Sequence, residues 1–105
     1  IASVLRAIPI ARMTPAGQMK PCAALFGGQR VPERFATYVA RQAPKAQRWR
    51  LVVGHCDAEA EAAEVLAALR VRLEVHEAWQ VETGPAIGAH AGPGALVASL
   101  QALPP

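Results

Sequence analysis

The sequence predicts an α/β two-layer sandwich, in which a mixed β-sheet, an N-terminal hairpin and two main helices form one domain of 105 residues. Segments with the period of a strand alternate with segments with the period of a helix. One short run, residues 51–53, is apolar at every position, which is typical of a strand covered on both faces. Hydrophobic residues make up 52% of the chain and aromatic residues only 5%, which favours helices packed on a sheet over an aromatic-rich binding surface.

The first predicted element is an antiparallel hairpin. Arg6–Met13 and Met19–Phe26 are short apolar segments. The five residues between them include Pro15 and Gly17, which suit a tight connection between two strands. The pair Gly27-Gly28 then ends the pattern.

A helix is predicted to follow over Val31–Gln42. Pro32 lies in its first turn, where the fixed φ of proline suits a helix and its missing N–H breaks no bond. Phe35, Tyr38 and Val39 give this helix an apolar stripe that can pack on the rest of the domain.

The strand predicted over Trp49–Gly54 contains the apolar run and is therefore expected to be central. Asp57 is placed to cap the helix after it. That helix has apolar residues at helical spacing, namely Ala58, Ala62, Val65, Leu66 and Leu69. Its glutamates favour the positive N-terminal end, and we interpret them as a solvated face rather than a catalytic pair: Glu59, Glu61 and Glu64.

Two further strands are expected. Val71–Val81 alternates apolar and polar residues, which predicts a strand with one wet face on which His76 is solvated. Ala95–Leu100 closes the fold, either as a strand or as a short helix.

Composition and motifs exclude several function classes. No apolar run approaches about 18 residues, so no membrane span is inferred. The first segment is broken by Arg6 and Arg12 and lacks a basic n-region, so no signal peptide is inferred. Cys22 and Cys56 lack zinc-ligand spacing, so we expect no metal and reduced structural thiols, as in a cytoplasmic protein. A single disulfide between them is the alternative. No serine sits in a nucleophile turn, and the glycine-rich segment lacks the Lys-Ser/Thr ending of a P-loop. These features favour a binding protein over an enzyme.

The net charge of +3 is unevenly distributed. Residues 1–50 carry nine Lys or Arg against one acidic residue, Glu33, whereas residues 51–105 carry two against seven. The basic residues are dispersed, which is typical of ordinary solvated faces. An acidic protein surface, a phosphorylated ligand or nucleic acid is the alternative partner for this half.

His55 follows the central strand and precedes a helix, where open α/β sheets bind their ligands. Two interpretations are open at this position. The imidazole is either a structural group hydrogen-bonded to the backbone or a contact in a ligand site.

A glycine-rich segment near the C-terminus surrounds a second histidine. Gly88, Gly92 and Gly94 can turn backbone N–H groups toward a shared concavity, and His90 adds a side-chain donor for a carboxylate or phosphate. The alternative is a conformational corner before the final strand.

This segment resembles the C-terminal part of the DegV family of bacterial fatty-acid-binding proteins. Residues 83–96 read Thr-Gly-Pro-Ala-Ile-Gly-Ala-His-Ala-Gly-Pro-Gly-Ala-Leu, similar to the family's Gly-Pro-x-Ile-Gly-x-His-x-Gly-Pro-Gly-Ala motif. Residues 53–57 are similar to the family's His-Gly/Ala-Asp stretch, and Gln29-Arg30 to its Arg-Thr before a helix. The order of these motifs covers nearly the whole chain.

The resemblance implies that a long-chain fatty acid lies in a tunnel between two α/β lobes. Its carboxylate would be bound by the motif histidine, His90 here, with the motif glycines around it and hydroxyls from the other lobe. The acyl chain would be the only ligand, without a further cofactor. Some members present the bound acid to a fatty-acid kinase, which basic residues such as Arg30 would then face.

The sequence differs from the family's motifs at two positions and has no counterpart of the family's N-terminal lobe. Ile8-Pro9 stands where the family usually has Lys-Pro, and Val31 replaces the threonine after the arginine. The family's N-terminal lobe has no counterpart in these residues, so residues 1–105 are expected to be the second lobe of a longer, two-lobed protein. The alternatives are a regulatory or dimerisation domain that has lost lipid binding, and a basic nucleic-acid-binding module, against which the low aromatic content argues.

Overall fold

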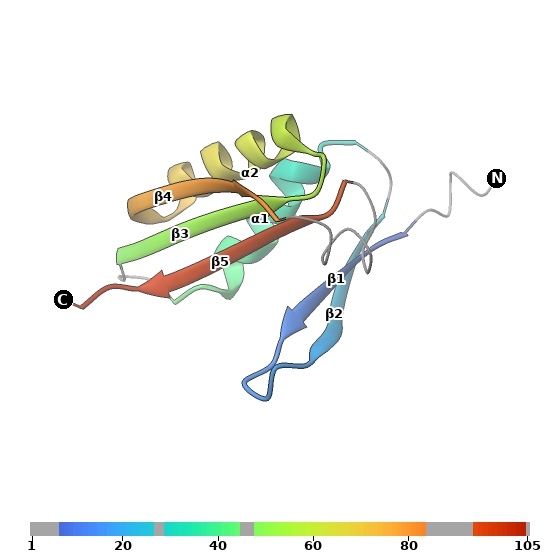
Figure 1. Ribbon diagram of the computed structural model, residues 1–105, viewed down its shortest axis with the longest axis horizontal. Helices are drawn as coiled ribbons and strands as arrows, with labels where there is room; N and C mark the ends of the chain where they lie inside the picture. The colour runs from blue at the N-terminus through green and yellow to red at the C-terminus, as the bar shows by residue number, and fades with distance from the viewer. Residues whose placement is uncertain (1–6, 27–28, 45–47, 84–93, 105) are drawn as a thin grey trace.

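A computed structural model describes residues 7–26, 29–44, 48–83 and 94–104. Two sheets and two helices confirm the predicted α/β class (Figure 1). In chain order the elements are β1 (Ala7–Met13), β2 (Met19–Phe26), α1 (Val31–Gln42), β3 (Arg48–His55), α2 (Glu59–Arg72), β4 (Glu74–Glu82) and β5 (Leu96–Ala102).

The N-terminal hairpin is confirmed. Strands β1 and β2 pair antiparallel, and the turn is closed by a bond from the Thr14 N–H to the Gln18 carbonyl at 2.7 Å. Gly17 takes a φ of 83°, which only glycine adopts without strain. The hairpin reaches α1 through the Tyr38 hydroxyl, which donates to Cys22 Sγ at 3.3 Å. Most hairpin side chains stay exposed, so this unit adds little to the core.

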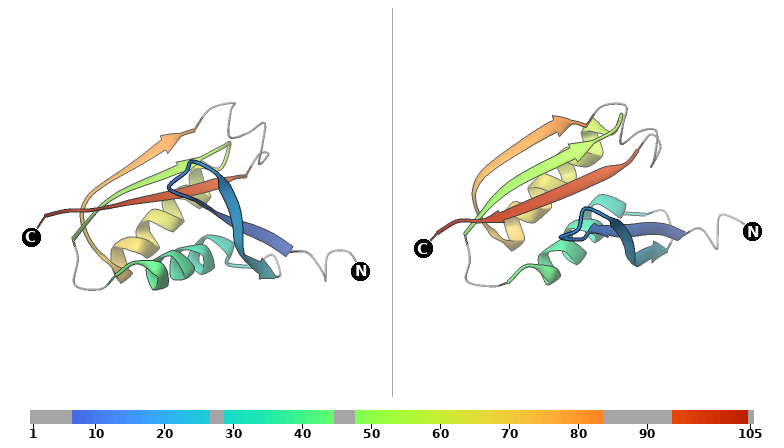
Figure 2. Two further views of the ribbon diagram at one scale, coloured as in Figure 1. Left: turned by 90° about the horizontal axis from the view of Figure 1, so that it is seen from below. Right: turned by 60° about the horizontal axis from the view of Figure 1, so that its bottom comes forward.

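The second sheet has the strand order β4-β3-β5, and β3 is central as predicted. Strand β4 runs parallel to β3, with α2 as the crossover between them, and β5 runs antiparallel to β3. The sheet is therefore mixed. Both helices lie on one face of it, as the two views of Figure 2 show.

The boundary between α2 and β4 differs from the sequence prediction, which began a strand at Val71. Helix α2 continues through Arg72, and the Leu73 N–H closes its last turn on the Leu69 carbonyl at 2.9 Å. Val71 is on the helix and 83% exposed. Val71 and Arg72 fit both the alternating pattern of a strand and the pattern of the preceding helix. They are helical because they complete the turn that follows the buried Leu69.

The last predicted element, Ala95–Leu100, was open between a strand and a short helix. The structure shows a strand, β5.

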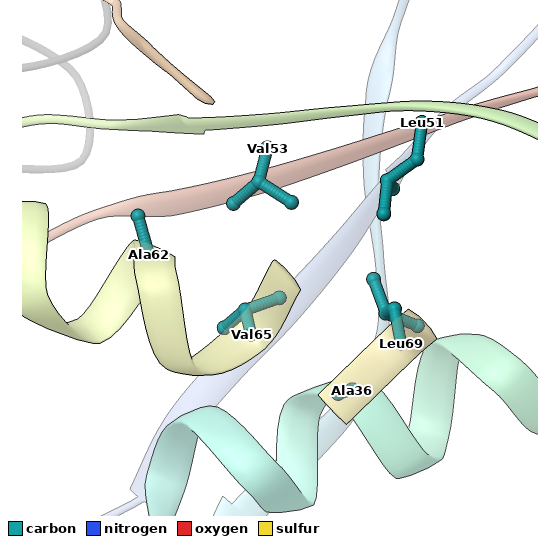
Figure 3. Packing of buried hydrophobic residues seen from close by; sticks show 6 residues of the cluster. All are labelled: Ala36, Leu51, Val53, Ala62, Val65 and Leu69. Carbon is teal, nitrogen blue, oxygen red and sulfur yellow. The ribbon is translucent and has the colours of Figure 1, made fainter. Parts of the chain in front are cut away.

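The core lies between β3 and the helices (Figure 3). Leu51 and Val53 extend from β3 toward Val65 and Leu69 of α2, and all four are fully buried. Ala36 brings α1 against the same cluster, since its small side chain lets the helices approach closely. Each large aliphatic side chain buried in this way contributes about 1.5 to 3 kcal/mol.

The other face of the sheet is divided into an apolar and a polar half. Val52 is paired with Trp79, and Gly54 with Val81 and Val97, so these positions share the face opposite the helices. We call Val52, Trp79, Val81 and Val97 the open-face patch; its last three members are 45%, 43% and 37% exposed. Farther along the strands, Arg50 lies 3.4 Å from the Glu77 carboxylate and 3.2 Å from Gln101 Oε1.

Candidate functional site

The ends of the glycine-rich segment are attached to two consecutive residues at the end of β3. On the outgoing side, Thr83 donates to the His55 carbonyl through its N–H at 2.8 Å and its hydroxyl at 3.0 Å. On the returning side, the Gly94 N–H donates to the Cys56 carbonyl at 2.7 Å, and the Cys56 N–H to the Ala95 carbonyl at 3.0 Å. The ten residues between therefore start and finish on one turn.

Of the predicted ligand-binding residues, His90, Gly88 and Gly92 lie outside the described residues. Gly94 is described and has a φ of 91°, in the left-handed region that favours glycine. A bend at this position turns the chain into β5, and the Gly94 N–H donates to the Cys56 carbonyl at 2.7 Å, so this N–H, which was assigned to a ligand from the sequence, is used within the chain.

Close packing fixes Thr83 against the central strand. A β-carbon at position 54 would lie 2.5 Å from Thr83 Cγ2, so only glycine fits there with Thr83 in this position. The hydroxyl bond to the His55 carbonyl holds the threonine rotamer that makes the contact. Gly54 and Thr83 thus set where β4 ends, and sequence reasoning assigned neither of them this role.

His55 is 6% exposed, and its Nδ1 accepts a hydrogen bond from the Ala58 N–H at 3.1 Å. This contact is the one expected of a structural imidazole bound to the backbone. The same Nδ1 lies 3.3 Å from Glu82 Oε2, at the end of β4. The histidine therefore joins three parts of the site: the end of β3, the start of α2 and the end of β4.

Asp57 does not cap α2, which corrects the sequence prediction. Its φ is 53°, its backbone N–H donates to Glu82 Oε1 at 3.3 Å, and the helix starts after Ala58 without a side-chain cap on that residue. Ala58 holds the N-cap position, so Asp57 lies one residue before the position that a capping side chain occupies. The His55 imidazole accepts the Ala58 N–H instead, a role that no periodicity in the sequence would reveal.

Arg30 is placed apart from Gly94. It precedes α1 with a φ of 55°, its side chain is 71% exposed, and it pairs with Glu33. Arg72 reaches the same carboxylate at 3.6 Å, and an open groove between α1 and the second half of α2 runs beside them. Gly94 is attached to the turn before α2, so the described contacts do not bring Arg30 and Gly94 together.

The ion pair between Arg30 and Glu33 shifts the pKa values of both side chains. The hydrogen bond and charge of Arg30 hold the pKa of the Glu33 carboxyl below its ordinary value, and the same pair raises the pKa of Arg30. The Glu33 carboxylate therefore pairs with two guanidinium groups, and Glu64 adds a second carboxylate to the lining of the groove.

The predicted solvated positions are confirmed. His76 is exposed, and so are the three glutamates of α2, as expected for solvated positions. Both cysteines are free. Within the described ranges no three His, Cys, Asp or Glu side chains gather as a metal site, and no described helix is long and apolar enough to span a membrane.

Comparison with known proteins decides the family. Residues 1–102 match the family described as "Uncharacterised protein, DegV family". The chain belongs to the DegV family. The resemblance seen in the sequence motifs is thereby confirmed, and no protein among the curated ones matches.

Solved structures share the fold with this DegV chain. A hypothetical protein from Thermotoga maritima, described as revealing a fatty acid binding function, is 24% identical with a TM-score of 0.78 over 94% of this chain and 36% of that one. A DegV lipid binding protein from the same organism is 26% identical, with a TM-score of 0.70 over 83% and 31%. A DegV-family protein from Ruminococcus gnavus, determined with vaccenic acid, is 27% identical, with a TM-score of 0.72 over 86% and 32%. The chain spans about a third of the length of each.

Proposed function

We propose that this chain forms half of a fatty-acid-binding site, with the carboxylate held at the glycine-rich segment by His90. Membership of the DegV family supports the ligand class, because one relative is described as a lipid binding protein and another was determined with vaccenic acid. The observation that carries the proposal is the attachment of both ends of this segment to His55 and Cys56. Such an anchor suits a short segment that must present donors to an anion.

The open-face patch supplies the apolar part of the proposed site. Val81 and Val97 flank Gly54, beside Thr83, and Trp79 lies one row farther along the sheet. An acyl chain that leaves the carboxylate site along this face would cover side chains that are otherwise exposed. Burial of each methylene would contribute about 0.8 kcal/mol.

Residues 1–105 are proposed to be one lobe of a two-lobed protein, with hydroxyl donors supplied by the other lobe. The share of each solved relative that this chain matches, about a third, supports this arrangement. So do the exposed apolar side chains of the hairpin, which a second lobe would cover: Met13, Met19 and Phe26. The role is binding rather than catalysis, because the residues invoked supply only donors and apolar surface.

Presentation of the bound acid to a fatty-acid kinase is the proposed use of the complex, in the cytoplasm. Arg30, just before α1, and Arg41, in its last turn, are exposed and give an acidic partner a surface to dock on. Reversing both charges should slow association more at low salt than at high salt. Equal rates at low ionic strength would leave these residues as a solvated face.

The decisive experiment compares vaccenic acid with its methyl ester by calorimetry in the complete protein. His90→Ala is expected to weaken acid binding by roughly 10- to 150-fold, since a hydrogen bond to a charged group contributes about 1.5 to 3 kcal/mol. Ester binding should change little, and the melting temperature of the ligand-free protein should be retained. A folded variant with unchanged affinity for the acid would refute the role of His90.

Trp79→Ala tests the acyl surface in the same assay. It should weaken both the acid and the ester, because the contact is apolar. Val71→Ala is the matched control, since Val71 is an exposed apolar residue on α2, away from the patch. Equal affinities for the two variants would show that the open-face patch does not contact the acyl chain.

A further inference from the structure

The Nδ1 atom of His55 has two neighbours that require opposite proton states. The Ala58 N–H, at 3.1 Å, needs an unprotonated nitrogen that accepts. Glu82 Oε2, at 3.3 Å, needs a protonated nitrogen that donates. One imidazole cannot satisfy both at once, so its proton state decides which neighbour it holds.

In the neutral state, Nδ1 accepts the N–H of Ala58, the residue just before the first turn of α2, and Nε2 carries the ring proton. The lone pair of Nδ1 then faces a carboxylate, and the Asp57 N–H, at 3.3 Å, is the donor that remains for Glu82. In the protonated state, Nδ1 donates a charge-assisted hydrogen bond to Glu82. Ala58 then loses its acceptor, and the start of α2 loosens.

Four titratable side chains lie at the ends of the elements that meet around His55. The titratable side chains on the surrounding elements are Glu82 on β4, Cys56 and Asp57 in the turn, and Glu59 at the start of α2. The described start of β5 adds none. Of these groups, the Glu82 carboxylate is the one in contact with the imidazole, at 3.3 Å from Nδ1.

His55 and Glu82 lie next to the residues that hold the two ends of the glycine-rich segment. Glu82 immediately precedes Thr83, whose two bonds to the His55 carbonyl anchor the outgoing end. Cys56 follows His55 and anchors the returning end. A change of partner at Nδ1 therefore acts on the residues that hold both ends.

We infer that His55 is a proton-dependent positioning residue, which exchanges the Ala58 N–H for the Glu82 carboxylate and thereby shifts the base of the glycine-rich segment. The exchange belongs to the ligand-free protein. Its effect on ligand affinity rests on the proposed function, whereas the exchange itself does not.

The first test is an NMR titration of the ligand-free protein between pH 5 and 8. In the parent, the Ala58 amide and the His55 imidazole should titrate together. His55→Asn should abolish the Ala58 transition and keep an acceptor for the Ala58 N–H, because asparagine accepts the N–H and does not titrate. Glu82→Gln should keep the transition and move it to lower pH, because a neutral acceptor stabilises the imidazolium less.

His76→Asn is the matched control, since it removes an exposed imidazole from the same strand as Glu82. The Ala58 transition should be unchanged in this variant. A parent Ala58 amide that does not titrate would overturn the inference. So would a transition at the same pH in Glu82→Gln, which also serves as the test if His55→Asn fails to fold.

The second test measures the affinity for vaccenic acid between pH 6 and 8. It should change across the Ala58 transition in the parent and stay flat in His55→Asn. Equal pH profiles in the two proteins would overturn the positioning role and leave the proposed function intact. An intact Ala58 transition in a protein that binds no vaccenic acid would instead remove the proposed function alone.

Discussion

Thr83 Cγ2 packs against the α-carbon of Gly54, at 2.5 Å from where a β-carbon would stand. Gly54→Ala should therefore destabilise the protein by about 1 to 3 kcal/mol, the usual cost of overpacking. Urea unfolding would measure it. The double variant Gly54→Ala/Thr83→Ser should recover most of the loss, because serine keeps the hydroxyl bond to His55 and lacks the methyl group. No recovery would mean that the threonine methyl is not the obstacle.

Gly94 tests backbone strain without steric crowding. Nothing lies within 4 Å of a β-carbon built there, yet its φ is 91°. Gly94→Ala should cost roughly 1 to 2 kcal/mol of unfolding free energy from strain alone. Gly94→Asn should cost less, because asparagine is enriched at positive φ. Equal unfolding free energies for alanine and glycine at this position would contradict the strain argument.

The link between the hairpin and α1 can be followed optically, because Tyr38 is the only tyrosine in the chain. Its hydrogen bond to Cys22 raises the pKa of the phenol above the ordinary value of 10.0. Cys22→Ala should lower that pKa, and absorbance at alkaline pH would measure the change. Because the neutral phenol is favoured in the folded state, the bond stabilises the protein below about pH 10 and its contribution is lost as pH rises through the raised pKa.

Glu33 gives the opposite pH dependence. Arg30 lowers the pKa of its carboxyl, so the pair stabilises the fold above the ordinary glutamate pKa of about 4.3 and the effect disappears as pH falls through the lowered value. Glu33→Gln should reduce the melting temperature slightly at pH 7 and not at all at strongly acidic pH. High salt should shrink the difference at pH 7, because both side chains are exposed.

Periodicity predicted the fold well wherever one face of an element is buried. The bounds of α1 and β2 agree with the structure, and the apolar run of β3 placed that strand at the centre. Val71 was misassigned because two residues at the end of a helix also fit an alternating pattern. Asp57 was predicted as a cap because aspartate suits that position in general, but Ala58 holds the N-cap position and His55 accepts its N–H.

The site was less predictable because its contacts cross between elements. Thr83 and Gly54 are far apart in sequence and meet only when β4 lies parallel to β3, a pairing that composition does not encode. Glu82 lies one residue beyond the predicted strand and had no predicted role, and its contact with His55 depends on the same register. The role of His90 came from motif resemblance and remains a prediction.

The position of β3 between β4 and β5 has a consequence for synthesis on the ribosome. Residues 48–82 contain a complete strand, helix and strand, so β3 and β4 can pair as soon as they emerge. The other edge of β3 must wait for residues 96–102, which are made later. Until then the nascent chain presents an unpaired and largely apolar strand edge, the kind of surface that recruits a neighbouring chain. A pause in translation while residues 48–82 are outside the ribosome and residues 96–102 are still inside its exit tunnel should therefore promote aggregation more than a pause before residue 48 has emerged.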